Sequence, residues 1–348
     1  MSTNALPNIL LIVDRPGWAT ELNASGLQSA LGGRYQVLKK SQTNVTARDL
    51  DQADLIQVFY WLQFLQMKTL GDAFSRNLHK LIIGVAGHVG IENERREPGL
   101  AWLRRGRAVY VISQLLFQEV KPLLDVPVFY APSGVDTTLF NPGPQRKRAG
   151  ALRVGWAGSL SNHGPEIRGF HELIVPAVNA VQGVELVTAI REEYWRTPAE
   201  MVEFYRSLDV YLCASRSEGT PNPCLEAAAC GIPLVSTRVG NMPELIRPGV
   251  NGFFIDREVD SIARVLALLR DSEGLRMRMA KAIRSSIPEW DWRRRTENYH
   301  QMYQFVLGGP QAESISGQKA EKHMGAFEEG SISRPSDTSK EADTHAGS

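Results

Sequence analysis

Cysteine, net charge and long apolar runs are all scarce in this sequence, and each shortage excludes a class of protein. Only three cysteines occur among 348 residues, and none has the paired spacing of a zinc site. We therefore expect Cys213, Cys224 and Cys230 to be buried free thiols in a reducing compartment. The formal net charge of +1 offers no general attraction to nucleic acid. No apolar run has the length of a transmembrane helix.

Targeting and cofactor motifs are missing as well. The first residues contain no basic segment followed by a long apolar core, so we expect no signal peptide and a cytoplasmic location. Peripheral contact with a membrane stays open. Neither a Gly-x-Gly-x-x-Gly fingerprint nor a Gly-Lys-Ser/Thr phosphate loop is present. The sequence thus predicts no bound cofactor and no metal site.

Short apolar runs alternate with helical or loop segments, which is typical of parallel sheets wrapped by helices. The expected strands are 8–13, 35–38, 54–59, 80–85, 108–112, 128–130, 152–156, 184–188, 210–213 and one that begins at 234. The expected domains are an N-terminal one at 1–142 and a C-terminal one at 151–307, joined by a basic Pro/Gly-rich linker at 143–150 and followed by a polar tail at 308–348. Two α/β domains of similar size predict a ligand cleft between them.

Residues 215–233 concentrate the candidate chemistry. Gly219 and Pro221 break the chain after a strand, and a helix follows that Gly231 and Pro233 end. Open α/β sheets bind ligands at this edge, where a helix N-terminus favours phosphate. Glu218 in the turn and Glu226 about a turn and a half along the helix are placed to grip hydroxyls at two ends of a phosphate-bearing molecule. The alternative is that both are solvated surface carboxylates.

A second candidate is the glycine-containing turn at 156–164, after the first strand of the second domain. Its backbone N–H groups are suited to a diphosphate, although such turns are common and weakly specific.

With these motifs in view, residues 200–252 resemble the retaining family-4 glycosyltransferases of the GT-B fold, also called group 1 glycosyltransferases. The resemblance rests on the segments 200–210, 227–233, 239–245 and 251–253, on Glu218-x7-Glu226, and on 132–136 with Phe140 and Pro142 before the linker. It implies two Rossmann-like α/β domains that face each other across a cleft. The first would bind an acceptor and the second a nucleotide sugar, and the C-terminal helix would cross back to the first domain.

The resemblance also implies roles for residues of the second domain. Glu218 would bind hydroxyls of the donor sugar together with the backbone that follows it, and Glu226 would accept hydrogen bonds from the ribose. Arg168 stands at the position of the lysine that contacts the diphosphate, and arginine serves a phosphate well. Directly after Gly158, Ser159 stands where the family usually has an arginine. The expected substrate-binding residues are Gly17, Gly158, Ser159, Arg168, Glu218, Gly219, Thr220, Pro221, Asn222 and Glu226.

In the first domain, the resemblance points to His88 as a residue that faces the donor sugar. The alternative is an ordinary hydrogen-bonded loop histidine. Gly17 would bring the backbone close to the ligand, but a plain turn explains it equally well. We therefore name His88, Arg168 and Glu218 as the catalytic candidates.

The predicted activity is transfer of a sugar from a nucleotide-sugar donor with retention of configuration and without a metal. Arg168, the helix dipole and backbone N–H groups would stabilise the leaving group in place of a cation. The acceptor is a glycan, a lipid-linked molecule or a small molecule, and nucleic acid is not expected. Two alternatives are a catalytically inactive GT-B-type binding subunit, suggested by Ser159, and a sugar-nucleotide 2-epimerase.

Overall fold

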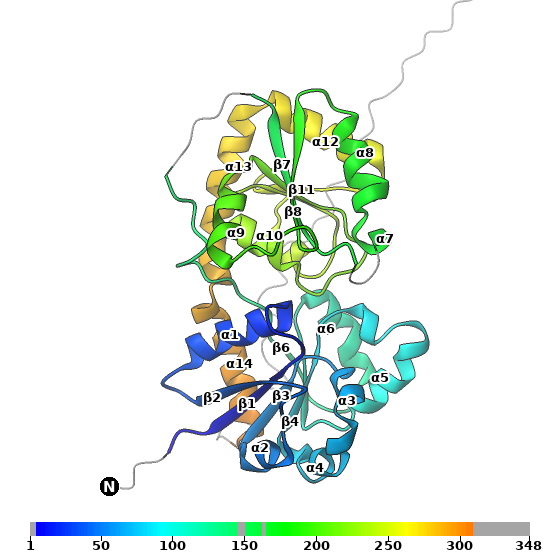
Figure 1. The fold of residues 1–348 in the computed structure, drawn as a ribbon, viewed down its shortest axis with the longest axis vertical. Coiled ribbons are helices and arrows are strands. Elements are labelled where there is room, and N and C mark those ends of the chain that lie inside the picture. The colour runs from blue at the N-terminus through cyan, green and yellow to red at the C-terminus, as the bar shows by residue number, and fades with distance from the viewer. Residues whose placement is uncertain (1–4, 145–149, 162–164, 309–348) are drawn as a thin grey trace, which may run out of the picture.

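The computed structural model describes residues 5–144, 150–161 and 165–308. The predicted tail from 309 onward and most of the predicted linker lie outside the described residues. Two α/β domains lie one above the other, with the N-terminal domain in blue and cyan and the C-terminal domain in green and yellow (Figure 1). Within the described ranges, no helix combines the length and the apolar character needed to cross a bilayer.

The N-terminal domain is built on a six-stranded parallel sheet with the order β2-β1-β3-β4-β5-β6. Its strands are β1 (Asn8–Val13), β2 (Gln36–Ser41), β3 (Leu55–Val58), β4 (Leu81–Val85), β5 (Ala108–Val111) and β6 (Val128–Tyr130). From Ile9 to Val13 every side chain of β1 is at most 3% exposed. Such continuous burial requires helices on both faces of the sheet.

Six α-helices and several 3-10 turns connect these strands. The helices are α1 (Ala19–Leu31), α2 (Ala47–Gln52), α3 (Gln63–Gln66), α4 (Gly71–Arg76), α5 (Arg96–Leu103) and α6 (Gln114–Val120), and the 3-10 turns are η1 (Lys68–Leu70), η2 (Leu78–Lys80), η3 (His88–Gly90), η4 (Asn93–Arg95) and η5 (Lys121–Leu123). Helix α6 begins at Ser113, whose hydroxyl accepts from the Leu116 N–H.

The C-terminal domain has a five-stranded parallel sheet with the order β11-β10-β9-β7-β8. Its strands are β7 (Leu152–Gly158), β8 (Val184–Ile190), β9 (Val210–Cys213), β10 (Leu234–Ser236) and β11 (Gly252–Phe254). Around it lie α7 (Pro165–Arg168), a π-helical turn η6 (Phe170–Ile174), α8 (Val175–Asn179), α9 (Pro198–Arg206), α10 (Asn222–Ala229), α11 (Met242–Leu245), α12 (Val259–Asp271), α13 (Glu273–Ser286) and the 3-10 turn η7 (Ile287–Trp290). The two parallel-sheet domains confirm the predicted fold class.

The last helix, α14 (Trp292–Val306), crosses back and packs on the N-terminal domain, as predicted (Figure 1). Its buried residues Trp292, Tyr299, Met302 and Tyr303 belong to the core of that domain. The Tyr303 hydroxyl donates to Gln57 Oε1 at 2.5 Å, and Gln57 Nε2 donates to the Tyr110 hydroxyl at 3.1 Å. These bonds satisfy the polar groups that α14 brings into the core.

The chain passes between the domains twice, and the two crossings are joined. Val135 N–H donates to the Trp290 carbonyl at 2.8 Å, and Trp292 N–H donates to the Val135 carbonyl at 3.3 Å. The Trp292 indole fills the space where a Cβ on Gly26 or Gly134 would stand. Because Gly26 and Gly134 have no side chains, the Trp292 indole can pack between the interdomain crossing and α1.

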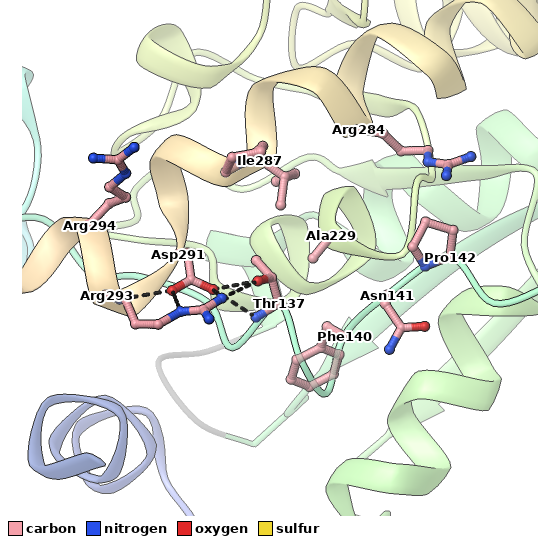
Figure 2. A pocket seen from close by; sticks show the side chains of 11 residues that line it. Thr137, Phe140, Asn141, Pro142, Ala229, Arg284, Ile287, Asp291, Arg293 and Arg294 are labelled. Atoms are coloured by element: carbon pink, nitrogen blue, oxygen red, sulfur yellow. Dashed lines mark hydrogen bonds and ion pairs between the residues drawn. The ribbon is translucent and has the colours of Figure 1, made fainter. Parts of the chain in front are cut away.

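A cavity of about 450 Å³ lies beside these crossings (Figure 2). One wall carries Asp291, which accepts hydrogen bonds from Arg293 and Thr137 (Figure 2). Although burial opposes ionisation, these bonds hold the pKa of Asp291 well below its usual range. The cavity reaches Ala229 at the C-terminal end of α10, whereas the candidate residues gather at the N-terminal end of that helix.

Candidate functional site

Arg168 and Glu218 meet at the carboxyl edge of the second sheet. Glu218 lies in the turn between β9 and α10, and Arg168 ends α7. Arg168 Nη1 lies 3.2 Å from Glu218 Oε1, which also accepts from the Ser215 hydroxyl at 2.9 Å. The guanidinium lies over the β7 turn, since its Nη1 is 3.6 Å from the position a Cβ on Gly158 would take. The structure therefore brings together three of the residues that the sequence singled out.

Not every N–H group of the Arg168 side chain has a hydrogen-bond partner among the residues that the structure describes. Its Nε is buried and has no hydrogen-bond partner among the residues that the structure describes. A buried N–H of this kind is rare in a folded protein, because its desolvation is not compensated. An unpaired donor on a guanidinium beside the turn after β7 fits an anionic ligand.

Glu226 lies deeper along α10 and is hydrogen-bonded to one neighbour. The Tyr205 hydroxyl of α9 donates to Glu226 Oε2 at 2.5 Å, and the side chain keeps partial exposure. Burial raises the pKa of Glu226 to about 7, even though the bond from Tyr205 acts against the rise. Near neutral pH this carboxyl therefore exists in both protonation states.

Gly219 lies at one of the contacts between the two domains. A Cβ at Gly219 would collide with the Ala86 carbonyl oxygen, and Gly219 N lies 3.7 Å from the Cβ position of Gly87. His88 follows in the same turn after β4, and its Nε2 lies 2.9 Å from Glu119 Oε2 of α6. The structure thus brings the turn that carries His88 next to Gly219 and ties the His88 ring to α6. Its catalytic role stays a prediction.

The start of α10 also contacts the first domain. Thr220 Oγ1 accepts from Asn241 Nδ2 at 3.0 Å, and Asn222 Nδ2 donates to Asn23 Oδ1 of α1 at 3.4 Å. Pro221 occupies the cap position and supplies no side-chain bond. The positive end of the α10 dipole therefore lies at the domain boundary, next to the Glu218 turn that Arg168 contacts.

The turn after β7 binds a carboxylate that sequence reasoning missed, from the segment that follows β8. Glu192 Oε1 accepts from the Ser159 hydroxyl at 2.5 Å, the Ser161 hydroxyl at 2.6 Å and the Ser161 N–H at 3.1 Å. Its Oε2 accepts from the Leu160 N–H at 3.1 Å. These bonds, first those from Ser159 and Ser161, hold the pKa of Glu192 well below its usual range. The donors that were expected to face a diphosphate are thus bound to an internal anion.

Gly17 lies at the domain boundary, under a pair of tryptophans and an arginine that the sequence analysis also missed. Gly17 has a φ of +72°, and a Cβ there would collide with Trp195 of the second domain. The Arg191 guanidinium lies between Trp18 and Trp195. Their position offered a signal, because Arg191, Glu192 and Trp195 lie within seven residues after the predicted strand at 184–188, at its carboxyl end.

Metal and thiol chemistry have few candidates here. In the described part of the chain, no group of three or more His, Cys, Asp or Glu side chains is placed to hold a metal ion. Cys213, Cys224 and Cys230 are buried and free, as expected.

Solved structures share the two-domain architecture. HepE of Anabaena, in complex with UDP and glucose, matches 84% of this chain and 98% of its own with a TM-score of 0.65 at 17% identity. Sucrose-phosphate synthase of Thermosynechococcus elongatus matches 87% of this chain and 99% of its own with a TM-score of 0.68 at 15% identity. These likenesses show the GT-B fold.

One segment of the sequence matches a known protein family. Residues 194–286, which include Glu218 and Glu226, match the protein family described as glycosyl transferases group 1. The matched segment is therefore similar to the group 1 glycosyltransferases, and together with the two-domain fold it supports that family for this chain.

Curated relatives of this chain include enzymes named D-inositol 3-phosphate glycosyltransferase. The one from Corynebacterium jeikeium is 32% identical over 110 residues, which are 31% of this chain and 26% of the relative. The one from Acidothermus cellulolyticus is 24% identical over 310 residues, which are 73% of this chain and 67% of the relative. The first match thus spans about a quarter of the relative's length and the second about two thirds.

Proposed function

We propose that this protein transfers a sugar from a UDP-sugar donor to an acceptor hydroxyl, with retention of anomeric configuration and without a metal ion. The observation that carries the proposal is the Arg168–Glu218 pair, 3.2 Å apart at the carboxyl edge of the second sheet, with Glu226 on the helix that follows. The choice of UDP is supported by Anabaena HepE, which has the same fold and was solved with UDP and glucose.

In the proposed reaction, the bond between the sugar and the diphosphate breaks, and its electron pair leaves with the diphosphate. Arg168 lies where this negative charge grows, and the α10 dipole points to the same place. Both favour the transition state over the bound donor, so they act on turnover more than on donor affinity. The acceptor oxygen attacks from the face that the diphosphate leaves, and the acceptor proton passes to a departing phosphate oxygen.

The two carboxylates are assigned to binding rather than to nucleophilic attack. Glu218 is held by Arg168 and Ser215, which orients its carboxylate toward sugar hydroxyls. Glu226 accepts hydrogen bonds from the ribose hydroxyls of the nucleotide. His88, fixed by Glu119, faces the sugar from the first domain.

The acceptor is a glycan, a lipid-linked molecule or a small molecule, and it is bound by the first domain. The names of the curated relatives make D-inositol 3-phosphate the first acceptor to test. We also propose a cytoplasmic location, because three buried free cysteines fit a reducing compartment.

The test uses the purified full chain with UDP-, GDP-, ADP- and dTDP-sugars, with and without D-inositol 3-phosphate. We expect a UDP-sugar to be consumed, EDTA to leave the rate unchanged, and NMR to show retained configuration in the product. Glu218→Gln should lose turnover, whereas Arg264→Ala, an exposed change on α12, should not. Epimerisation of the sugar, or UDP binding without turnover of any donor or acceptor, would contradict the proposed transfer.

A further inference from the structure

Arg191 occupies the space between the glycine turns of the two domains. It directly follows β8, and its N–H donates to the Gly158 carbonyl at 3.0 Å. Its guanidinium reaches the other way, with Nη1 3.4 Å from the Gly17 carbonyl oxygen. A molecule that enters between the carboxyl edges of β1 and β7 therefore meets this cation.

The two faces of the Arg191 guanidinium stack on tryptophan rings, so the N–H groups along its edge stay available for hydrogen bonds. Its Cζ lies 3.9 Å from the ring centroid of Trp18 and 3.6 Å from that of Trp195. Indole faces attract a cation without neutralising it. Arg191 has one long hydrogen bond, to a carbonyl, and no carboxylate within ion-pair distance among the residues described. Most of its N–H donors are thus uncommitted.

The charges around Arg191 favour an anion from outside the chain. Burial lowers the pKa of Arg191, with Arg15 adding to the effect, and the nearby carboxylates of Glu192 and Asp14 do not offset it. The Glu192 carboxylate is already bound by the β7 turn. The guanidinium is therefore an under-compensated cation at the boundary between the two domains.

Because the Glu192 carboxylate binds the turn after β7, a diphosphate at that turn needs a nearby cation such as Arg191. Glu192 occupies the N–H groups of Leu160 and Ser161, so a diphosphate cannot use them while it is there. A phosphate beside Glu192 would also meet a like charge, which only a nearby cation can offset. On the far side of Gly158, Arg168 supplies one cation, and Arg191 is placed to supply a second.

We propose that Arg191 is a diphosphate-binding residue of the donor site and that Trp195 positions it. The inference rests on the proposed function, because it names a further residue of the same site. The donor diphosphate lies between Arg191 and Arg168, and Trp18 and Trp195 keep the guanidinium plane turned toward it. Because arginine binds phosphate through a planar fork, lysine replaces only part of this interaction.

The experiment compares UDP, uridine and inorganic pyrophosphate by isothermal titration calorimetry. Arg191→Ala should weaken UDP binding about thirtyfold, within the range for a hydrogen bond to a charged group, and leave uridine binding within about twofold. Pyrophosphate binding should weaken as well, and Arg191→Lys should recover part of the loss. The matched control is Arg196→Ala, because Arg196 also stacks on rings, those of Tyr194 and Phe204, but bonds only to the Thr188 carbonyl.

Each other outcome has a definite meaning. Unchanged UDP binding in Arg191→Ala would overturn the inference. Equal weakening of UDP and uridine would also overturn it, since Arg191 would then only hold the domains together. If the wild-type protein bound no nucleotide, the UDP-sugar proposal would fail, and pyrophosphate alone would decide whether Arg191 binds phosphates. Should Arg191→Ala not fold, Arg191→Gln, which keeps much of the stem, takes its place in the same comparison.

Discussion

Glu226 should make donor binding depend on pH, because its ionised form is the one that accepts two ribose hydroxyls. With a pKa of about 7, the carboxyl is mostly protonated at pH 6 and mostly ionised at pH 8. Apparent affinity scales with the fraction in the binding-competent state, so the Kd for UDP should be about tenfold higher at pH 6 than at pH 8. Glu226→Gln should remove this dependence and weaken binding at pH 8 by about 1.5–3 kcal/mol.

The assay is calorimetric titration of both proteins with UDP across this pH range at constant ionic strength. The terminal phosphate of UDP titrates near pH 6 on its own, so only the difference between wild type and variant reports Glu226. If the wild-type affinity for UDP changed with pH in the same way as that of Glu226→Gln, Glu226 would not be the source of the pH dependence. Equal affinity of the two proteins at pH 8 would remove Glu226 from the site.

The same carboxyl should leave a signature in stability. Its folded pKa of about 7 lies above the ordinary value of 4.5, so its contribution to stability is present below pH 4.5 and is lost as pH rises through 7. Between those limits the wild type should lose up to about 3 kcal/mol relative to Glu226→Gln. Urea denaturation of both proteins at pH 5 and pH 8 measures the difference, and a loss with the opposite sign would contradict the assignment.

Three further substitutions test the site and the packing around it. Arg168→Ala should lower kcat at least about a hundredfold with a smaller effect on donor binding, and Arg168→Lys should recover part of it; near-normal kcat would take Arg168 out of the mechanism. Gly219→Ala, whose Cβ would collide with the Ala86 carbonyl, should reduce turnover strongly while Tm changes little, and normal kinetics would show that the domains need not touch there. Gly26→Ala should destabilise the fold by about 1–3 kcal/mol in urea denaturation, because the new methyl would overlap Trp292, and unchanged stability would show that the indole moves aside.

Much of the fold could be predicted from the sequence, because strands that are buried on both faces consist of consecutive apolar residues. The predicted strand at 8–13 matches β1, and 128–130 matches β6. The prediction of 35–38 was too short, since β2 runs to Ser41. Lys39 and Lys40 lie on this edge strand and pair with Glu21 and Asp49, so the strand continues through charged residues that look like its end.

The candidate site could be predicted where residues that are close in the sequence are also close in space. Glu218 and Glu226 share one turn and one helix, and Arg168 follows the neighbouring strand, so the sheet edge gathers all three. The contact of Arg191 with Trp18 joins two domains across 173 positions of sequence, which no local pattern encodes. Glu192 reaches the β7 turn because Gly158 pairs with Ile190 in the parallel register, a fact that only the sheet supplies.

The return of α14 has a consequence for how the protein is made. The sheet of the first domain is complete at Tyr130, but its core lacks Tyr299, Met302 and Tyr303 until the ribosome has added about 176 further residues. At about 5–20 residues per second, that interval lasts roughly 10–35 s. During it, a groove lined with apolar side chains stays open to water on the nascent chain. The core of the first domain therefore closes only after the whole second domain has been synthesised.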